Sequence, residues 1–473
     1  MPARARSVVL GISVAVVLVL SGIVVSQPPP PPTYYSHVAA ILEQHCTGCH
    51  TAGGIAPFSL EDPEIAVLMA PAIKYVVERG IMPPWPPGPD SPPMIGERKL
   101  SPQEKEILIT WADAGAPLGN PQDRPPSAAQ PRPSDPQPHR LLTLTPPYQP
   151  NLARSDDYRC FLLDPQIEHD TFVTGYRVFP GQKKLVHHVI LFVIGPQNLR
   201  EVEAKDQSEP GPGWTCYGGP GVGSMSANVL GDSLGFWVPG TSGTDFPTGI
   251  GKLLRAGSRI IMQVHYNTRQ ATPEDADATQ VALYLSSENL KPLEGLTLFA
   301  PVEVRCPGPY PDDPDDPCHR DYALARTELA FVANGVHSLC RTQIEDFLKR
   351  EIGDGSAQEM HCDRPLRQDV LALGITGHMH LRGKSLKIEV NPGTPHARTL
   401  LSIPRWDFNW QGQYWFQEPI ALKAGEILRL SCVYDNSQTI MGPDRQPLPP
   451  RYMTWGEGTT DEMCLGGIAF VRP

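Results

Sequence analysis

The chain has 473 residues, a length that favours two to four domains at roughly 150 residues each. Its formal net charge is −11 at pH 7, and its basic residues form no run beyond the first six residues. Phosphate binding needs clustered Lys and Arg, so this balance argues against a nucleic-acid partner. The 54 prolines predict many loops and linkers and few long helices.

The N-terminus has the pattern of an export signal. Arg4 and Arg6 precede an apolar run from Val8 to Val25, which is at the lower limit of length for crossing a bilayer. Residues 1–26 therefore fit both a cleaved signal peptide and a retained membrane anchor. In either case we expect the rest of the chain to be extracytoplasmic, periplasmic or secreted, because the positive end stays inside.

Residues 33–119 are expected to form a small all-α domain. Helical periodicity is clearest over residues 100–114, where Ser101 is a candidate N-cap and Glu104 completes a capping box. Residues 120–140 are rich in Pro, Asp, Gln and Ser and lack a hydrophobic period. This composition predicts a semi-extended linker.

From residue 141 onward, short runs of β-branched and aromatic residues are punctuated by Gly, Pro and Asp, which predicts all-β, jelly-roll-like sandwiches. About 330 residues exceed a single sandwich, so we expect two, at 141–290 and 291–473. Residues 303–366 interrupt the pattern with four cysteines and a helix near 342–350, and are expected to be an insertion. The expected strands lie at residues 171–178, 186–194, 258–268, 280–285, 371–377, 385–390 and 426–434.

The segment Cys46-Thr47-Gly48-Cys49-His50 has the C-x-x-C-H spacing of a covalent haem site. Two thiols add across the vinyl groups of haem, and the adjacent His becomes the proximal iron ligand. A bare C-x-x-C is also typical of a redox or zinc pair, but the appended His and the export signal favour haem. We therefore expect one covalently bound haem c on Cys46, Cys49 and His50.

The second iron ligand is expected to be a methionine. Met69, Met82 and Met94 follow the motif, and Met82 opens a Met-Pro-Pro-Trp segment that would hold its sulfur on a rigid loop. The region resembles the small class I-type cytochrome c fold, and Met82 matches its distal loop. A packing role for Met82 is the alternative. Methionine ligation would make the haem an electron carrier.

Five histidines of the β region fall into motifs, namely the pair His187-His188, His265 in a Gln-Val-His-Tyr strand, and His378-Met379-His380. An H-x-H on a strand places both imidazoles on one face, whereas adjacent histidines can share a metal only if the strand twists or ends there. Satisfied core histidines are the alternative for each ring. Imidazole suits Cu, Zn, Fe and Ni, and a thioether such as Met463 selects Cu(I).

The order of these motifs, followed by Glu462-Met463-Cys464, resembles the copper type II, ascorbate-dependent monooxygenases over about residues 150–473. Peptidylglycine α-hydroxylating monooxygenase and dopamine β-monooxygenase belong to this family. The resemblance implies two β-sandwiches facing a cleft and the reaction R–H + O2 + 2e⁻ + 2H⁺ → R–OH + H2O. In the family, the methionine-ligated copper activates O2 and the all-histidine copper stores and relays an electron. The resemblance implies two copper ions, one on His187, His188 and His265 and the other on His378, His380 and Met463.

Eight cysteines remain outside the haem motif, and an even number in an oxidising compartment predicts four disulfides. Scattered free thiols are the alternative. Three connectivities are open within the insertion, where local pairing is our expectation. The resemblance implies Cys160–Cys216 and Cys432–Cys464, and the expected local pairs are Cys306–Cys318 and Cys340–Cys362.

The sequence departs from the family in two respects. The peptide-amidating enzyme binds its substrate carboxylate with Arg, Asn and Tyr, at positions that hold Thr376, Leu465 and Gly467 here. Leu465 and Gly467 suggest a more apolar or roomier pocket. The fused haem domain is the second departure, and we hypothesise that it delivers electrons to the copper centres in place of ascorbate.

Together these features predict a copper-dependent monooxygenase that hydroxylates a C–H bond of a small organic substrate with O2, using electrons supplied through the fused haem. One alternative is a non-catalytic periplasmic electron-transfer or copper-binding protein that keeps the scaffold. Another is a structural sandwich carrying a cytochrome, which leaves the clustered histidines unexplained. Met463 favours O2 chemistry, because a copper carrier does not need two differently ligated sites.

The replacement of the carboxylate-binding residues leads to a first prediction. We expect the copper-loaded protein to give no amidated product from a peptide with C-terminal glycine, because Thr376 and Leu465 supply no charge for the carboxylate. Mass spectrometry of the incubated peptide checks this. Measurable amidation would refute the prediction.

Overall fold

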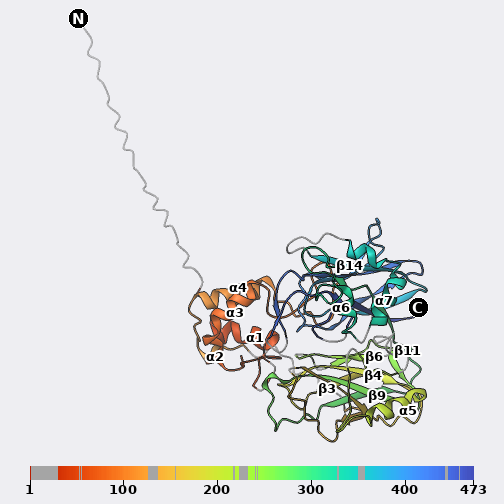
Figure 1. Ribbon diagram of the computed structural model, residues 1–473. Coiled ribbons are helices and arrows are strands. Elements are labelled where there is room, and N and C mark those ends of the chain that lie inside the picture. The colour runs from red at the N-terminus through yellow and green to blue at the C-terminus, as the bar shows by residue number, and fades with distance from the viewer. Residues whose placement is uncertain are drawn as a thin grey trace.

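A computed structural model describes residue 1 and residues 30–52, 54, 56–125, 137–154, 156–216, 219–222, 233–239, 241, 243–327, 330–349, 357–442, 446–456 and 459–473. The described chain is mostly β-sheet, and a helical domain lies beside two stacked β-sandwiches (Figure 1). The expected signal or anchor segment falls in residues 2–29 and the centre of the expected linker in residues 126–136, both outside the described residues. No described helix is both long and apolar enough to cross a membrane.

The helical domain packs around buried Trp111 and Leu108 of its last long helix, α4 (Pro102–Asp113). The capping box expected there is confirmed: the Ser101 side chain accepts from the Glu104 N–H, and the Glu104 carboxylate accepts from the Ser101 N–H. The remaining short elements of this region are η1 (Tyr34–Val38), α1 (Ala39–His45), α2 (Pro63–Leu68), α3 (Ala70–Glu78) and η2 (Pro121–Asp123).

The first sandwich has one sheet in the order β1-β10-β3-β8-β11, with β7 on β3, and a second in the order β5-β2-β9-β4-β6. The strands expected at 171–178, 186–194, 258–268 and 280–285 are confirmed as β3, β4, β9 and β10. The strands are β1 (Arg140–Thr143), β2 (Asp156–Leu163), β3 (Thr171–Phe179), β4 (Val186–Ile194), β5 (Trp214–Thr215), β6 (Ser233–Trp237), β7 (Gly243–Asp245), β8 (Ile250–Leu254), β9 (Arg259–Asn267), β10 (Gln280–Ser286) and β11 (Lys291–Pro292). Short helices η3 (Pro196–Asn198), α5 (Leu199–Asp206) and η5 (Thr268–Gln270) lie between them.

The second sandwich pairs a sheet β12-β23-β15-β18 with a sheet β14-β19-β16-β17. The strands expected at 371–377, 385–390 and 426–434 are confirmed as β15, β16 and β19. The main strands are β12 (Glu294–Phe299), β14 (Gln358–Pro365), β15 (Val370–His378), β16 (Gly383–Val390), β17 (Arg398–Ile403), β18 (Gln413–Leu422), β19 (Ile427–Tyr434) and β23 (Leu465–Val471). Minor elements are β13 (Glu303–Val304), β20 (Ile440–Met441), β21 (Pro447–Leu448), β22 (Met453–Thr454), α6 (Arg320–Leu324), α7 (Ala330–Cys340) and α8 (Ile344–Leu348).

The structure differs from the expected insertion at residues 303–366 in one respect. Its C-terminal part is the regular strand β14, which pairs along its whole length with β19. Buried Met360 and Cys362 alternate with exposed Glu359 and His361, as one buried face of a sheet requires. The strand was missed because only two side chains of its buried face are apolar.

The expectation of four disulfides is confirmed. Cys340–Cys362 ties α7 to β14, and Cys432–Cys464 ties β19 to the residue before β23. Cys46 and Cys49 are the unpaired cysteines. The four pairs are Cys160–Cys216, Cys306–Cys318, Cys340–Cys362 and Cys432–Cys464.

The segment between α3 and α4 docks the helical domain onto the second sandwich. Met94 is 1% exposed and belongs to the core of that sandwich. A Cβ on Gly88 would lie 2.8 Å from Cδ of Pro404, so the backbone can approach there only without a side chain. Backbone hydrogen bonds join the segment to the sandwich, from Gly88 N–H to Ser402 O (2.7 Å), from Ile95 N–H to Trp415 O (2.7 Å) and from Gln417 N–H to Pro93 O (3.0 Å).

Removing the Met94 side chain tests this docking. We expect Met94→Ala to lower the free energy of unfolding by about 2 to 5 kcal/mol, because a buried thioether is replaced by a cavity. The shift of the urea unfolding transition, followed by tryptophan fluorescence, measures the loss. The neighbouring Ile95, which is 61% exposed, provides the control, because Ile95→Ala should stay within about 0.5 kcal/mol of the parent. Equal stability of the two variants would contradict the docking.

Candidate active site

The histidines of the first sandwich meet where β4 pairs with β9. The register between these strands shifts between Val186 and His188, so His187 is an extra residue in β4. A bulge of this kind bends a strand and re-aims its side chains. The adjacent His187 and His188 therefore both reach His265 of β9 without the strand ending.

The potential ligand atoms of His187, His188 and His265 all lie within 4.8 Å of one another, a spacing that could hold a metal ion. Nδ1 of His187 lies 3.2 Å from Nδ1 of His265. On its other side, His265 Nε2–H donates to Oδ1 of Asp156 at 2.7 Å. Because the proton is held at Nε2, Nδ1 of His265 carries the lone pair that faces the cluster.

The ring of Tyr158 stacks on the ring of His265, with centroids 4.1 Å apart and an interplanar angle of 11°. Tyr158 and Asp156 both come from β2, which pairs with β9. One neighbouring strand therefore sets both the plane and the tautomer of His265.

The surroundings of this cluster favour neutral imidazoles, because His265 is buried and His187 and His188 are half-buried. Burial lowers the pKa of His265 and of His188 well below the usual value, and the neighbouring rings add to the effect. Burial also lowers the pKa of His187, although Asp156 opposes the shift. Neutral imidazole is the form that binds a metal, so no proton has to be removed near neutral pH.

The second pair of histidines lies at the end of β15. His378 is the last residue of that strand and His380 lies beyond it, so the expectation that both occupy one strand is wrong. The side chain of Met379 between them is buried in the core. The two imidazole rings are 5.0 Å apart and nearly perpendicular, at 83°.

Oxygen acceptors orient both rings. His378 Nδ1–H donates to Oε1 of Gln411, and His380 Nδ1–H donates to the carbonyl oxygen of Asp461 at 3.1 Å. Burial lowers the pKa of His378, and the bond to Gln411 opposes the shift. Each ring therefore keeps its Nε2 lone pair for a metal.

The backbone around Met463 is anchored from several sides. Tyr434 OH donates to Met463 O at 2.8 Å, and the next residue, Cys464, is disulfide-bonded. The side chain of Glu462 is fully buried and accepts from the N–H groups of His380 (2.9 Å) and Arg382 (2.6 Å). Burial raises the pKa of Glu462 to about 8 in spite of these bonds. Glu462 thus ties the Met463 segment to the His380 turn.

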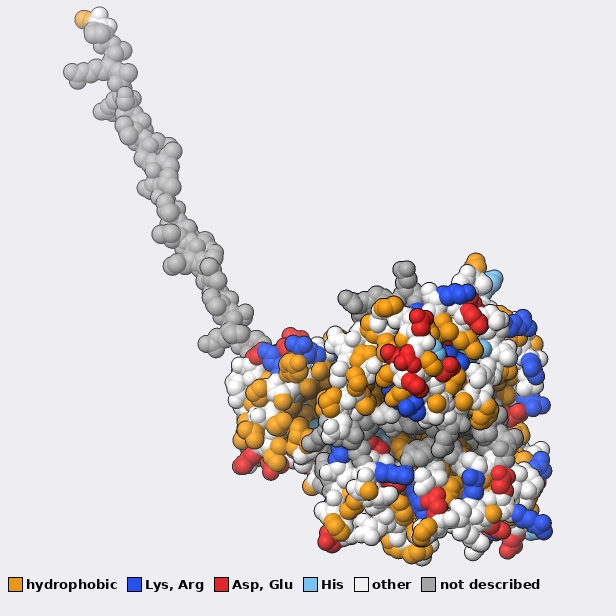
Figure 2. Space-filling view, in the orientation of Figure 1, with side chains coloured by type: hydrophobic (Ala, Val, Ile, Leu, Met, Phe, Trp, Pro, Cys, Tyr) orange, Lys and Arg blue, Asp and Glu red, His pale blue; other side chains and the backbone are white. Residues whose placement is uncertain are grey.

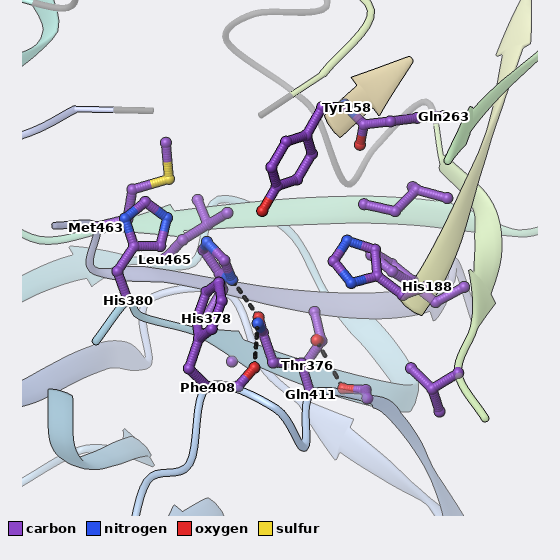
Figure 3. A pocket seen from close by; sticks show the side chains of 15 residues that line it. Tyr158, His188, Gln263, Thr376, His378, His380, Phe408, Gln411, Met463 and Leu465 are labelled. Atoms are coloured by element: carbon purple, nitrogen blue, oxygen red, sulfur yellow. Dashed lines mark hydrogen bonds between the residues drawn. The ribbon is translucent and has the colours of Figure 1, made fainter. Parts of the chain in front are cut away.

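One cavity is lined by candidate ligands of both sandwiches (Figure 3). It has an empty volume of about 900 Å³, part of it open to solvent. In Figure 3, His380 and Met463 lie at one end and His188 at the other, with Tyr158 and His378 between them. Most of the remaining lining is apolar, from Ile190, Phe236, Val238, Phe408 and Leu465.

The cavity lining also places the residues that differ from the peptide-amidating enzyme. Thr376 and Leu465 line the cavity, and Thr376 Oγ1 donates to Gly412 O at 2.9 Å. Gly467 lines a smaller neighbouring hollow, so the apolar contribution to this cavity comes from Leu465. Lys and Arg are absent from the described residues that line the cavity. The site therefore offers an organic ligand mainly apolar contacts.

The C-x-x-C-H segment follows α1. Burial raises the pKa of Cys46 to about 12, and both thiols are unpaired. Nδ1 of His50 lies 3.2 Å from Phe58 O, a bond that leaves Nε2 free to bind iron. Met82 follows α3 and is half-buried, with its N–H donating to Val76 O at 3.3 Å.

The other two methionines that follow the motif lie in different cores. Met94 is buried in the core of the second sandwich and is therefore no longer a candidate iron ligand. Met69 packs against the core of the helical domain. Met82 keeps its expected role as a prediction.

Several residues of the site had no signal in the sequence. Asp156, Tyr158 and Gln411 orient or stack on the histidines, but they lie on other strands or in a loop and form no motif with them.

No protein-family model matches the chain. The chain is 24% identical over 327 residues to "Putative DBH-like monooxygenase protein 2" of Homo sapiens, covering 66% of this chain and 53% of that protein. It is 23% identical to "DBH-like monooxygenase protein 2" of Mus musculus, covering 59% and 37%. The chain thus spans about half or less of the length of these relatives and is distantly similar to DBH-like monooxygenase proteins. Among solved structures, a fucolectin from Morone saxatilis covers 67% of this chain and 84% of its own at 9% identity and a TM-score of 0.17, too low to support any inference.

The contact between Asp156 and His265 yields a testable consequence. We expect Asp156→Ala to weaken copper binding at the His187, His188 and His265 cluster by about 10- to 100-fold, because the tautomer of His265 is no longer held. Copper titration under anaerobic conditions measures the change. Two controls accompany the titration. The copper affinity of the site formed by His378, His380 and Met463 should not change. The variant Asp164→Ala, just beyond the end of the same strand, should bind copper like the parent. Unchanged affinity in Asp156→Ala would exclude this role.

Proposed function

We propose that this protein is a copper-dependent monooxygenase that hydroxylates a C–H bond of a small organic substrate with O2. The observation that supports this most is the cavity shared by His188 of the first sandwich and His378, His380 and Met463 of the second. Two different donor sets beside one apolar space suit a reaction better than copper storage. The distant similarity to DBH-like monooxygenase proteins points the same way.

The donor atoms fit copper. The first ion would be held by the imidazoles of His187, His188 and His265, and the second by Nε2 of His378 and His380 with the sulfur of Met463. Copper, when bound, supplies one-electron chemistry with O2, and a thioether ligand favours its reduced state. The hydrogen bonds to Asp156, Gln411 and Asp461 hold the rings in place before any ion arrives.

The lining of the cavity indicates the substrate class. Phe236, Phe408 and Leu465 provide apolar contact and exclude water from the reacting bond. With Thr376 Oγ1 bonded to Gly412 O, the wall offers little to a carboxylate. We infer an uncharged or largely apolar substrate.

The C-x-x-C-H segment fits a haem c. Cys46 and Cys49 remain thiols while the other eight cysteines are paired, and His50 has Nε2 free. Trp85 Nε1–H, three residues after Met82, is buried without a hydrogen-bond partner, so a carboxylate of a bound haem could complete it. Bound haem supplies one-electron transfer, with His50 and Met82 as the proposed iron ligands. We propose that it feeds the copper sites.

The four disulfides and the similarity to DBH-like proteins support an extracytoplasmic location. The proposed partners are the small-molecule substrate and O2, with electrons entering through the haem domain. An oxidising compartment suits the four disulfides.

Substitution of the sulfur ligand tests the proposal. Purified protein supplied with copper should contain one haem and two coppers and show substrate-dependent O2 uptake with apolar or phenolic candidates. We expect Met463→Ala to reduce that uptake to background while the haem spectrum is retained, because one donor of the second site is lost. Met441→Ala, at a side chain that is 60% exposed, is the matched control and should keep full activity. If the purified protein contained haem but no copper, it would be an electron carrier and not a monooxygenase.

A further inference from the structure

The helical domain meets the second sandwich through an aromatic contact as well as through hydrogen bonds. The Trp85 ring lies 5.5 Å from the Tyr414 ring, centroid to centroid, at an angle of 74°. Trp85 packs against the core of the second sandwich, and Tyr414 of β18 is 6% exposed within that core. An edge-to-face pair of this kind is a stable, well-positioned contact. It lies three residues after Met82, and three residues span at most roughly 10 Å.

The C-x-x-C-H segment begins directly after α1, at Cys46. In Figure 1, α1 lies on the side of the helical domain that faces the second sandwich, so the segment begins on the side that carries the Trp85 contact.

From Tyr414 a short bonded path leads to the second copper site. Tyr414 is three residues after Gln411, whose Oε1 accepts from His378 Nδ1–H. The intervening backbone is held to β15, because Thr376 pairs with Gln413 and Thr376 Oγ1 donates to Gly412 O. The path therefore consists of one aromatic contact, three residues of fixed backbone and one hydrogen bond to a metal-site imidazole.

An alternative route for electrons would run from the helical domain to the all-histidine site of the first sandwich. Glu61 of the helical domain is held at low pKa mainly by the Ala52 N–H, and Lys183 of the first sandwich contributes. Lys183 precedes His187 by four residues. This approach consists of an exposed carboxylate and a lysine, which are screened by solvent and provide no packed contact. The route through Trp85 is better suited to electron transfer, because its residues are in packed contact.

We propose that Trp85 and Tyr414 couple the haem site to the His378, His380 and Met463 site, so that electrons from the haem enter there and not at the all-histidine site. The inference rests on the proposed function. In the transfer, the haem iron passes from ferrous to ferric as one cupric ion becomes cuprous, and no proton or atom moves. Tyr414 is a positioning residue, and neither Tyr414 nor Trp85 would bind a metal.

The test uses the full, copper-loaded protein without O2. A flash photoreduces the haem, and its reoxidation by Cu(II) is followed in the haem absorption band, with copper-free protein as the baseline. We expect Trp85→Leu and Tyr414→Leu to slow reoxidation about tenfold or more, the effect of roughly 1.4 kcal/mol of added barrier. Trp85→Phe and Tyr414→Phe keep an aromatic ring and should recover most of the rate.

Matched controls distinguish a loss of the Trp85–Tyr414 path from a loss of domain docking. They also distinguish electron entry at one copper site from entry at the other. Arg405→Ala removes the hydrogen bonds to Arg79 O and Gly80 O at the same interface and should keep the parental rate. His188→Ala, which disables the first site, should keep fast reoxidation, and His380→Ala should lose it. The haem spectrum and circular dichroism verify folding, and the partly exposed Trp85 remains informative if a Tyr414 variant does not fold.

The outcomes distinguish a failure of the proposed electron supply from a failure of the proposed path. If the parent haem is never reoxidised by Cu(II), the proposed electron supply fails and this inference fails with it. If the parent transfers electrons but the leucine variants match it, or Arg405→Ala is equally slow, the path is overturned and the proposed function stands. Fast transfer in His380→Ala but not in His188→Ala would assign entry to the all-histidine site.

Discussion

His265 donates its Nε2–H to Asp156, and His378 and His380 donate their Nδ1–H groups to Gln411 and Asp461. These bonds decide which nitrogen of each ring keeps a lone pair. A neutral imidazole has one donor and one acceptor nitrogen, so satisfying the donor inside the protein turns the acceptor toward the cavity. Burial strengthens the constraint, because an unpaired donor would be costly there. The rest of the site depends on this arrangement.

The sandwiches provide the rigidity that such bonds need. The bulge at His187, the pairing of β2 with β9 and the disulfide beside Met463 each place one group by the packing of a whole sheet. Close-packed interiors resist small displacements, so donor atoms stay positioned without a bound ion. The helical domain is attached to the same framework, since Met94 fills part of the second core. The helical domain and the cavity are thus connected through packed protein.

Local elements could be predicted from the sequence where the hydrophobic period and the residue types indicated the same structure. The α4 capping box needs only Ser101 and Glu104, three residues apart, and β4 and β19 are continuous runs with strong β propensity. Strand β14 was missed because only two side chains of its buried face, Met360 and Cys362, are apolar. His380 was misplaced because a strand end depends on which partner strand stops pairing. The hollow that Gly467 lines could not be read from the sequence, because the neighbours of a strand residue belong to other strands.

The sequence by itself determined the chemistry on offer: an unpaired C-x-x-C-H segment, histidines in pairs, a methionine beside a cysteine, and eight further cysteines that form four disulfides. Composition and spacing suffice for this, because thiols, imidazoles and thioethers carry their reactivity with them. Only the tertiary structure decided that His188 and Met463 border one cavity, that Asp156 and Gln411 choose the tautomers, and that Trp85 touches Tyr414. These relations join residues far apart in the chain, and only the packing of the sheets brings them together.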